Sequence, residues 1–322
     1  KIPVKIPTVA EVIPRSVASA HPRESRVAPR AAAVPCPPWK PAGISIPNAG
    51  FKSGSITLRT SMEKIDYEKE FLSIYNKFNQ KYSKWEVWKD FLYLSAASMA
   101  NTVKTAEWQQ REERYLQTIG KYEKEYQEMM PNLFAVTAAA LDDNPEQDFL
   151  GKLYHRIGLE QEQKGQFFTP YHICEFMSEI NYAGDEMLDA KTGKKYITVS
   201  DPACGAGCML IAFANTARKH KINYQDKVLF VAQDIDETAM LMCYVQLSLL
   251  GCNAAVIRGD SLAKPGFHPD NDVWFTPMLY LKWEKFRGFF EGTEEATQQI
   301  SMNPLDMKQF VEEASGQMTL AI

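Results

Sequence analysis

Apolar residues recur every three or four positions between residue 61 and about residue 160, and this period predicts amphipathic helices. One helical face collects Phe71, Ile74, Tyr75 and Phe78. The same spacing continues through Trp85, Trp88, Leu92 and Ser95, and then through Trp108, Tyr115, Ile119, Tyr122 and Tyr126. Aromatic stripes of this kind are typical of core packing. The sequence therefore predicts a helical domain at 61–160 with no chemistry of its own.

The pattern changes after residue 180, where short apolar or β-branched runs alternate with helical ones. The runs cover 196–201, 227–234, 254–260 and 273–281, and the helical stretches between them include 208–219 and 236–250. The second of these helices is apolar on nearly all sides, which predicts that it is buried. Such alternation indicates βα units around a parallel sheet. We therefore expect an α/β domain over residues 161–322.

The first 60 residues show neither period. They contain ten of the 18 prolines, and nine Lys or Arg against two Glu give them a net charge of +7. We expect this segment to be disordered or irregular, either a solvated tail or a basic arm that contacts DNA or a partner. The whole chain has a net charge of −4, so residues 61–322 carry −11. This acidic charge argues that the folded part does not bind nucleic acid without a partner, because phosphate contacts require an excess of Lys and Arg.

Signals for a membrane, for secretion and for a metal site are missing from the sequence. No run approaches the roughly 18 apolar residues of a spanning helix, and no apolar h-region follows the basic N-terminus. The six cysteines are scattered, as in proteins of a reducing compartment, and neither they nor the five histidines have metal-ligand spacing. We expect a cytoplasmic protein with no membrane contact, no disulfide and no metal.

A glycine-rich segment lies between the first predicted strand and the next helix. It runs from Asp201 to Gly207 and reads D-P-A-C-G-A-G. Its two glycines allow close approach of a ligand, and the free N–H groups at the start of the helix favour a carboxylate or a phosphate. By itself, the motif is equally typical of a tight strand-to-helix turn.

Acidic residues also follow the next two predicted strands, at the edge where open α/β sheets bind ligands. Asp234 ends the second strand, a position from which a carboxylate accepts the ribose hydroxyls of a nucleoside, and Asp260 follows the third. The third glycine of the dinucleotide fingerprint is missing, since Met209 and Leu210 follow Cys208. The pattern thus indicates a nucleoside ligand and disfavours a classical dinucleotide fold.

Four motifs occur in a fixed order: G-Q-F-F-T-P at 165–170, D-P-A-C-G-A-G at 201–207, Q-D-I-D at 233–236 and G-D-S-L at 259–262. Over about residues 145–262 the chain resembles the adenine-N6 DNA methyltransferases, specifically the modification subunits of type I restriction-modification systems. The resemblance implies a doubly wound, Rossmann-like sheet that binds S-adenosylmethionine. Here that sheet would be abbreviated at the C-terminus and preceded by the helical domain.

The resemblance also implies which residues contact the cofactor. The methionine end would be lined by Phe167, Phe168 and Thr169, and the amino-acid moiety would be wrapped by Asp201, Gly205 and Gly207. The ribose would be held by Asp234, and the adenine would meet Ile235 and Asp260. The cofactor-binding set is completed by their neighbours Gln166, Pro202 and Ser261.

The family's catalytic motif, Asn/Asp-Pro-Pro followed by Phe or Tyr, is altered in this chain. At the end of the fourth predicted strand, Thr276 stands in place of Asn or Asp, Met278 in place of the second Pro, and the aromatic is displaced to Tyr280. Thr276, Pro277 and Tyr280 are the candidate catalytic residues of this degenerate motif. A threonine hydroxyl is shorter and a weaker acceptor than a carboxamide or carboxylate oxygen, so we expect methyl transfer to be slowed or absent.

An Asn-Pro pair that resembles the start of the catalytic motif occurs further along the chain, at Asn303-Pro304. The pair is typical of a helix start. Its alternative role is to supply the acceptor oxygen that Thr276 lacks.

Two functions are consistent with these motifs. The first is an S-adenosylmethionine-binding DNA adenine-N6 methyltransferase of the restriction-modification type, with impaired or partner-dependent activity. The second is a catalytically inactive cofactor-binding or scaffold subunit that acts through a partner. Methylation of a small molecule or a protein is a third hypothesis, because such sheets host many acceptors. Only 42 residues follow Tyr280, so we expect a specificity or recognition partner to read the DNA.

Overall fold

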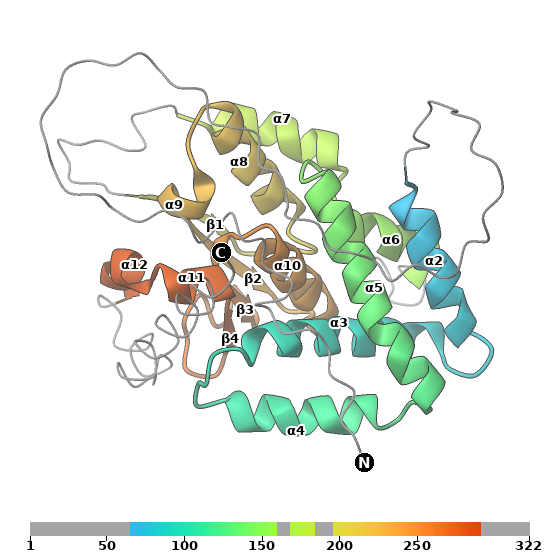
Figure 1. Ribbon diagram of the computed structural model, residues 1–322. Coiled ribbons are helices and arrows are strands. Elements are labelled where there is room, and N and C mark those ends of the chain that lie inside the picture. The colour runs from blue at the N-terminus through green and yellow to red at the C-terminus, as the bar shows by residue number, and fades with distance from the viewer. Residues whose placement is uncertain (1–64, 160–167, 184–195, 291–322) are drawn as a thin grey trace, which may run out of the picture.

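The computed structural model describes residues 65–159, 168–183 and 196–290, which form a mixed α/β structure (Figure 1). The predicted segment 1–60 and Asn303 lie outside these ranges, as do Gln166 and Phe167. The N-terminal helices are α2 (Tyr67–Phe78), α3 (Lys84–Ala100), α4 (Trp108–Ile119), α5 (Lys124–Asp143), α6 (Phe149–Ile157) and α7 (Tyr171–Asn181). The elements that follow are β1 (Ile197–Asp201), α8 (Cys208–Lys219), α9 (Tyr224–Lys227), β2 (Val228–Asp234), α10 (Glu237–Leu249), β3 (Asn253–Arg258), β4 (Asp272–Phe275), α11 (Pro277–Leu281) and α12 (Trp283–Phe290).

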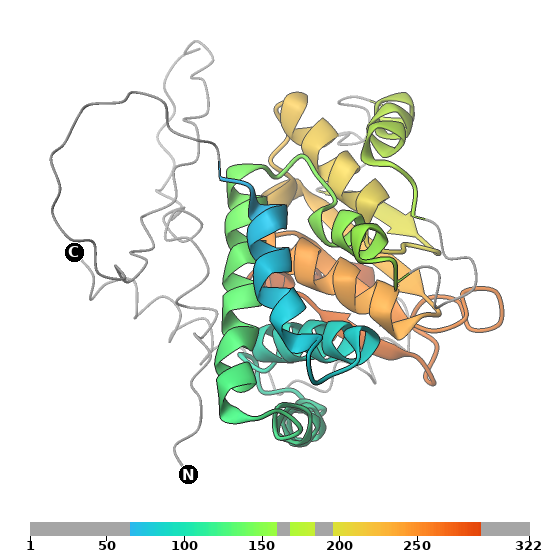
Figure 2. The ribbon, with the colours of Figure 1, turned by 90° about the vertical axis from the view of Figure 1, so that its right-hand side faces the viewer.

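The predicted helices between residues 61 and 160 are confirmed, and their aromatic residues form a core. Phe71, Tyr75 and Trp88 are completely buried, with ring centroids 6.0 Å apart in each pair. Asp66 caps α2 by accepting a hydrogen bond from Lys69 N at 3.0 Å. Figure 2 shows α2, α3 and α5 packed together beside α10. One hydrophobic core runs through these helices and into the sheet.

The sheet has the strand order β1-β2-β3-β4 in the described residues. β1, β2 and β3 are parallel, as the sequence predicts. The prediction of a parallel fourth run at 273–281 is wrong. β4 is antiparallel to β3, with Arg258 opposite Asp272 and Ala255 opposite Phe275, and α11 begins at Pro277.

The reversal at β4 has a physical cause in the connection that precedes it. The 13 residues between β3 and β4 contain no helix, whereas the connection between parallel strands usually contains one. Asn271 closes this loop by donating hydrogen bonds from Nδ2 to Lys264 O at 2.8 Å and to Gly266 O at 2.7 Å. The chain therefore re-enters the sheet at the edge it has just left.

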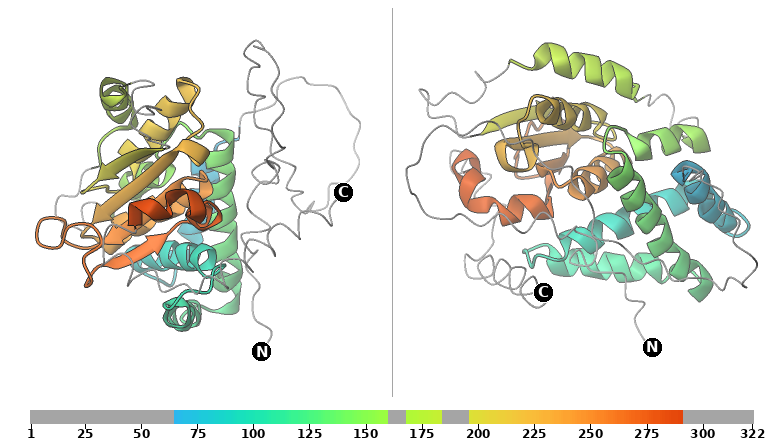
Figure 3. Two further views of the ribbon diagram at one scale, coloured as in Figure 1. Left: turned by 90° about the vertical axis from the view of Figure 1, so that its left-hand side faces the viewer. Right: turned by 45° about the horizontal axis from the view of Figure 1, so that its top comes forward.

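Helices cover both faces of the sheet (Figure 3). Phe230, Ala232 and Val256 face the core shared with α8 and α10, whereas Leu229 and Ala255 face the core formed with α11 and α12. α8 and α10 follow consecutive parallel strands and pack in the first of these cores, as expected when successive crossovers have the same hand. The described strands do not include the reversal of strand order that defines a doubly wound sheet. Within the same residues, no helix has the length and apolarity needed to cross a membrane.

Candidate functional site

Two left-handed glycines shape the loop between β1 and α8. Gly205 has φ 54° and Gly207 has φ 90°. A Cβ atom on Gly205 would lie 2.8 Å from the Phe168 ring, and one on Gly207 would lie 2.9 Å from Cys243 Sγ in α10. Any other residue at these positions is therefore both strained and crowded. Gly207 immediately precedes α8, whose first N–H groups lack intrahelical partners.

The Asp234 carboxylate joins this loop to the tip of β2. Its Oδ2 accepts a hydrogen bond from Gly205 N at 2.8 Å, and its Oδ1 accepts one from Asp236 N at 2.9 Å. The residue is 9% exposed. Burial raises the pKa of Asp234 above its usual value, although the backbone N–H groups oppose the shift. Burial also raises the pKa of Asp201, and the negative charge of Asp234 adds to the effect.

The tip of β3 lies directly beside the tip of β2, because Gly259 N donates to Asp234 O at 2.9 Å. Asp260 follows and is exposed, with Oδ1 accepting from Leu262 N at 2.9 Å. Ile235 and Leu262, the apolar residues of these two tips, are 67% and 95% exposed. Apolar side chains in solvent next to hydrogen-bond acceptors suit a flat ring with polar edges. Ser261, which is half-buried, completes this stretch.

Phe168 forms a wall beside the glycine loop. Its backbone N donates to His155 Nε2 at 3.3 Å, and its ring packs between Tyr154 and His155 at centroid distances of 5.3 and 5.4 Å. Thr169 and Pro202 are exposed. The structure therefore brings Phe168, the glycine loop and the acidic strand tips together at the carboxyl ends of the parallel strands.

Gln246 supports this edge from inside α10, although it is not among the site residues predicted from the sequence. It is completely buried. Its Nε2 donates to Asp148 Oδ1 and to Ala206 O, both at 2.8 Å, and its Oε1 accepts from Leu150 N at 3.1 Å. Burial raises the pKa of Asp148, and the hydrogen bond from Gln246 opposes that shift. A lone glutamine in a helix predicted to be apolar all round was the available signal, since buried polar groups need partners.

Thr276 lies away from this edge. It is completely buried. Its Oγ1 donates to Cys252 O at 2.7 Å and accepts from Ala254 N at 2.9 Å. These partners are at the start of β3, whereas Asp234 is at the opposite end of the sheet. Five residues of β-strand span about 16 Å, so Thr276 is separated from the acidic tips by roughly the length of β3.

Pro277 and Tyr280 are equally remote from the acidic tips. Both are residues of α11 and are buried, and Tyr280 packs in the core that α11 and α12 form with the sheet. The antiparallel direction of β4 is the cause, because it carries the end of this strand toward the start of β3. The structure thus does not bring the three candidate catalytic residues to the candidate cofactor edge.

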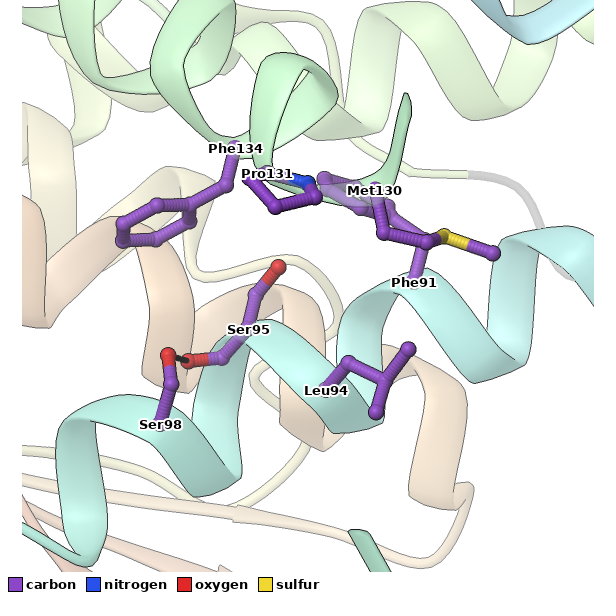
Figure 4. A pocket seen from close by; sticks show the side chains of 7 residues that line it. All are labelled: Phe91, Leu94, Ser95, Ser98, Met130, Pro131 and Phe134. Atoms are coloured by element: carbon purple, nitrogen blue, oxygen red, sulfur yellow. Dashed lines mark hydrogen bonds between the residues drawn. The ribbon is translucent and has the colours of Figure 1, made fainter. Parts of the chain in front are cut away.

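Two hollows elsewhere in the described residues are less suitable as ligand-binding sites than the carboxyl ends of the strands. A cavity of about 10 Å³ between α3 and α5 is too small for an organic ligand (Figure 4). A crevice of about 150 Å³ among α3, α4 and α10 has polar walls. Its Arg114 pairs with Glu237 at 2.8 Å and its Lys121 with Asp90 at 3.3 Å. The described ranges contain no group of three or more His, Cys, Asp or Glu side chains arranged to hold a metal ion.

An α/β sheet with a glycine turn after β1 and acids at successive strand tips is an arrangement typical of nucleoside-binding domains. Residues 146–281 match the family model described as N-6 DNA Methylase. The matched segment contains the glycine loop, both acidic tips and all four strands, and it belongs to the adenine-N6 DNA methyltransferase family. A comparison with the curated proteins gave no match.

Proposed function

We propose that the chain binds S-adenosylmethionine at the carboxyl ends of β1, β2 and β3 and acts in DNA adenine-N6 methylation of the restriction-modification type. The observation that carries this proposal is the Asp234 carboxylate, which is buried at the tip of β2, 9% exposed, and ties the glycine loop to that strand. A carboxylate has about four acceptor positions, and backbone N–H groups of Gly205, Ile235 and Asp236 take up part of this capacity. The remaining capacity suits a ribose hydroxyl, so the residues present fit the cofactor.

The other residues of the edge have complementary roles in this proposal. The unpaired N–H groups at the start of α8 attract a carboxylate, and Asp201 attracts an ammonium group. Ile235 offers apolar contact for an adenine ring, and Asp260 offers an acceptor for its amino group. When bound, S-adenosylmethionine would supply an electrophilic methyl group. Phe168 excludes water from one side of the glycine loop.

DNA recognition is assigned to a partner in this proposal. Residues 61–322 carry a net charge of −11, and an acidic surface repels the phosphate backbone. A specificity or recognition subunit with a basic surface would supply the sequence reading. This chain would bind the cofactor for the complex.

The burial of Thr276 favours the second candidate function, a cofactor-binding or scaffold subunit without independent activity. A group that holds the target amine must reach the methyl donor. The hydroxyl of Thr276 is instead shared between Cys252 and Ala254. In this version of the proposal, the acceptor oxygen comes from a partner or from residues outside the described ranges.

The test measures transfer of labelled methyl groups to DNA that contains unmethylated adenine. The chain alone is expected to show transfer at or below detection. Thr276→Val is expected to lower the free energy of unfolding by about 1–3 kcal/mol, because it leaves a buried N–H and a buried carbonyl without their partner. The same variant should leave cofactor affinity unchanged. Robust transfer by the chain alone that Thr276→Val abolishes would contradict this account.

A further inference from the structure

The polar crevice among α3, α4 and α10 contains two hydroxyl groups without a partner. Thr118 of α4 and Thr238 of α10 line its floor, although the two residues are only 4% and 3% exposed. Within the described ranges, neither hydroxyl forms a hydrogen bond. Buried polar groups normally have a partner. Two unpaired hydroxyls that line the same crevice therefore indicate a polar ligand.

The rim of this crevice carries an excess of positive charge. Lys89 forms no ion pair in the described part of the chain, and its Nζ lies 5.6 Å from the centre of the Trp85 ring. Arg114 and Arg258 share one carboxylate oxygen, Glu237 Oε1, at 2.8 and 3.4 Å. Residues 61–322 carry a net charge of −11, whereas four cations and two carboxylates give this crevice a local charge of +2: Lys89, Arg114, Lys121, Arg258, Asp90 and Glu237.

The first turn of α10 faces the same crevice. Glu237 and Thr238 begin this 13-residue helix, and both line the crevice. Asp236 caps the helix by accepting a hydrogen bond from Ala239 N at 2.8 Å, but the N–H groups of the first two residues have no partner within the helix. The N-terminus of a helix carries a partial positive charge that attracts anions. The cations, the hydroxyls and the helix end together point to an anionic ligand.

We propose that this crevice is a binding site for a phosphate group. Its cations and the hydroxyls of Thr118 and Thr238 supply the donors that phosphate oxygens accept. The local charge of +2 matches a phosphate monoester, which carries about −1.5 to −2 near pH 7, better than it matches a single carboxylate. The volume of about 150 Å³ is below the roughly 300 Å³ at which pockets for organic ligands begin. The crevice therefore suits a group of few atoms.

The crevice lies next to the acidic strand tips. Glu237 follows Asp234 by three residues, and Arg258 is opposite Asp234 in the register of β2 and β3. The backbone of a DNA substrate at the candidate cofactor site would thus pass close to these cations. Sequence reading stays with a partner, because phosphate contacts carry no base information. The phosphate site itself is independent of the proposed function, and only DNA as the source of the phosphate rests on it.

Isothermal titration of the full chain with inorganic phosphate, at fixed ionic strength, tests the site. Thr238→Val removes one hydroxyl, and Lys89→Met removes the cation that has no ion pair. Each is expected to weaken phosphate binding roughly tenfold or more, because a hydrogen bond to a charged group is lost. Lys69→Met removes an exposed lysine of α2 and should bind phosphate like the wild type. In phosphate-free buffer, Thr238→Val should leave the urea midpoint unchanged, since its hydroxyl has no partner to lose.

Titration of the same chains with a short DNA duplex identifies the source of the phosphate. Duplex affinity that falls in Thr238→Val and Lys89→Met, but not in Lys69→Met, assigns the crevice to the DNA backbone. Phosphate binding that the two variants weaken, with equal duplex affinity in all chains, assigns it to a small phosphate compound. Absence of phosphate binding at millimolar concentration, or the same phosphate affinity in all four chains, would overturn the proposal. None of these measurements needs the cofactor, so this site and the proposed function can fail separately.

Discussion

Replacing Gln246 with leucine is expected to lower the free energy of unfolding by about 3 kcal/mol. The side chain makes three buried hydrogen bonds, to Asp148, to Ala206 and from Leu150. Leucine of similar size can make none of them. The loss is largest at Asp148, because this buried carboxylate keeps the hydrogen bond from Gly151 N at 2.9 Å but loses its side-chain donor.

Urea unfolding followed by circular dichroism measures this change. Gln117→Leu is the matched control, since Gln117 is exposed on α4, and it should change stability by less than about 0.5 kcal/mol. Adding Asp148→Asn to Gln246→Leu should recover part of the loss, because the uncompensated charge is removed. If Gln246→Leu were as stable as the wild type, the network would not have the structural role assigned to it.

Gly207→Ala is expected to damage both the fold and the candidate site. A side chain at φ 90° costs about 1–2 kcal/mol. At this position, the new Cβ would also meet Cys243 Sγ at 2.9 Å and Cys243 Cα at 3.4 Å. Relieving that contact must move the loop or α10, which we expect to cost about 1–3 kcal/mol more. Because the loop precedes α8, cofactor affinity should fall at least tenfold.

Gly158→Ala separates the two contributions. Gly158 ends α6 with φ 80°, and a Cβ atom there would meet nothing within 4 Å. This control should therefore lose only the conformational part, about 1–2 kcal/mol, with cofactor affinity intact. Equal effects of the two substitutions on stability and affinity would show that the close approach to Cys243 is unimportant.

The parts of the fold that follow from local pattern were predictable. The helices, the three parallel strands and the buried position of α10 follow from apolar periodicity, and the acidic tips of β2 and β3 follow from the ends of those strands. The direction of β4 does not, because its short run of residues fits either direction. It depends on a 13-residue loop that Asn271 closes.

The environments of single polar residues were harder to predict. Thr276 was interpreted as part of a degenerate motif on the basis of its neighbours in sequence. Its hydrogen bonds go to Cys252 and Ala254, which only the pairing of β3 with β4 brings near. The partners of Gln246 are likewise far away in sequence, at Asp148 and Ala206. Such contacts belong to the tertiary structure, and a single sequence does not encode them in any local spacing.

Isothermal titration of the full chain with S-adenosylmethionine, or with its demethylated product, tests the central claim most directly. We predict binding that Asp234→Ala weakens by about 1–3 kcal/mol, or roughly 5- to 150-fold, because ribose hydroxyls lose their acceptor. Asp270→Ala, at an exposed loop carboxylate, should leave the affinity unchanged. Since burial raises the pKa of Asp234, affinity should also decline on acidification at a higher pH than an exposed carboxylate would cause. Absence of binding at millimolar ligand, or equal affinity of the wild type and Asp234→Ala, would contradict the account.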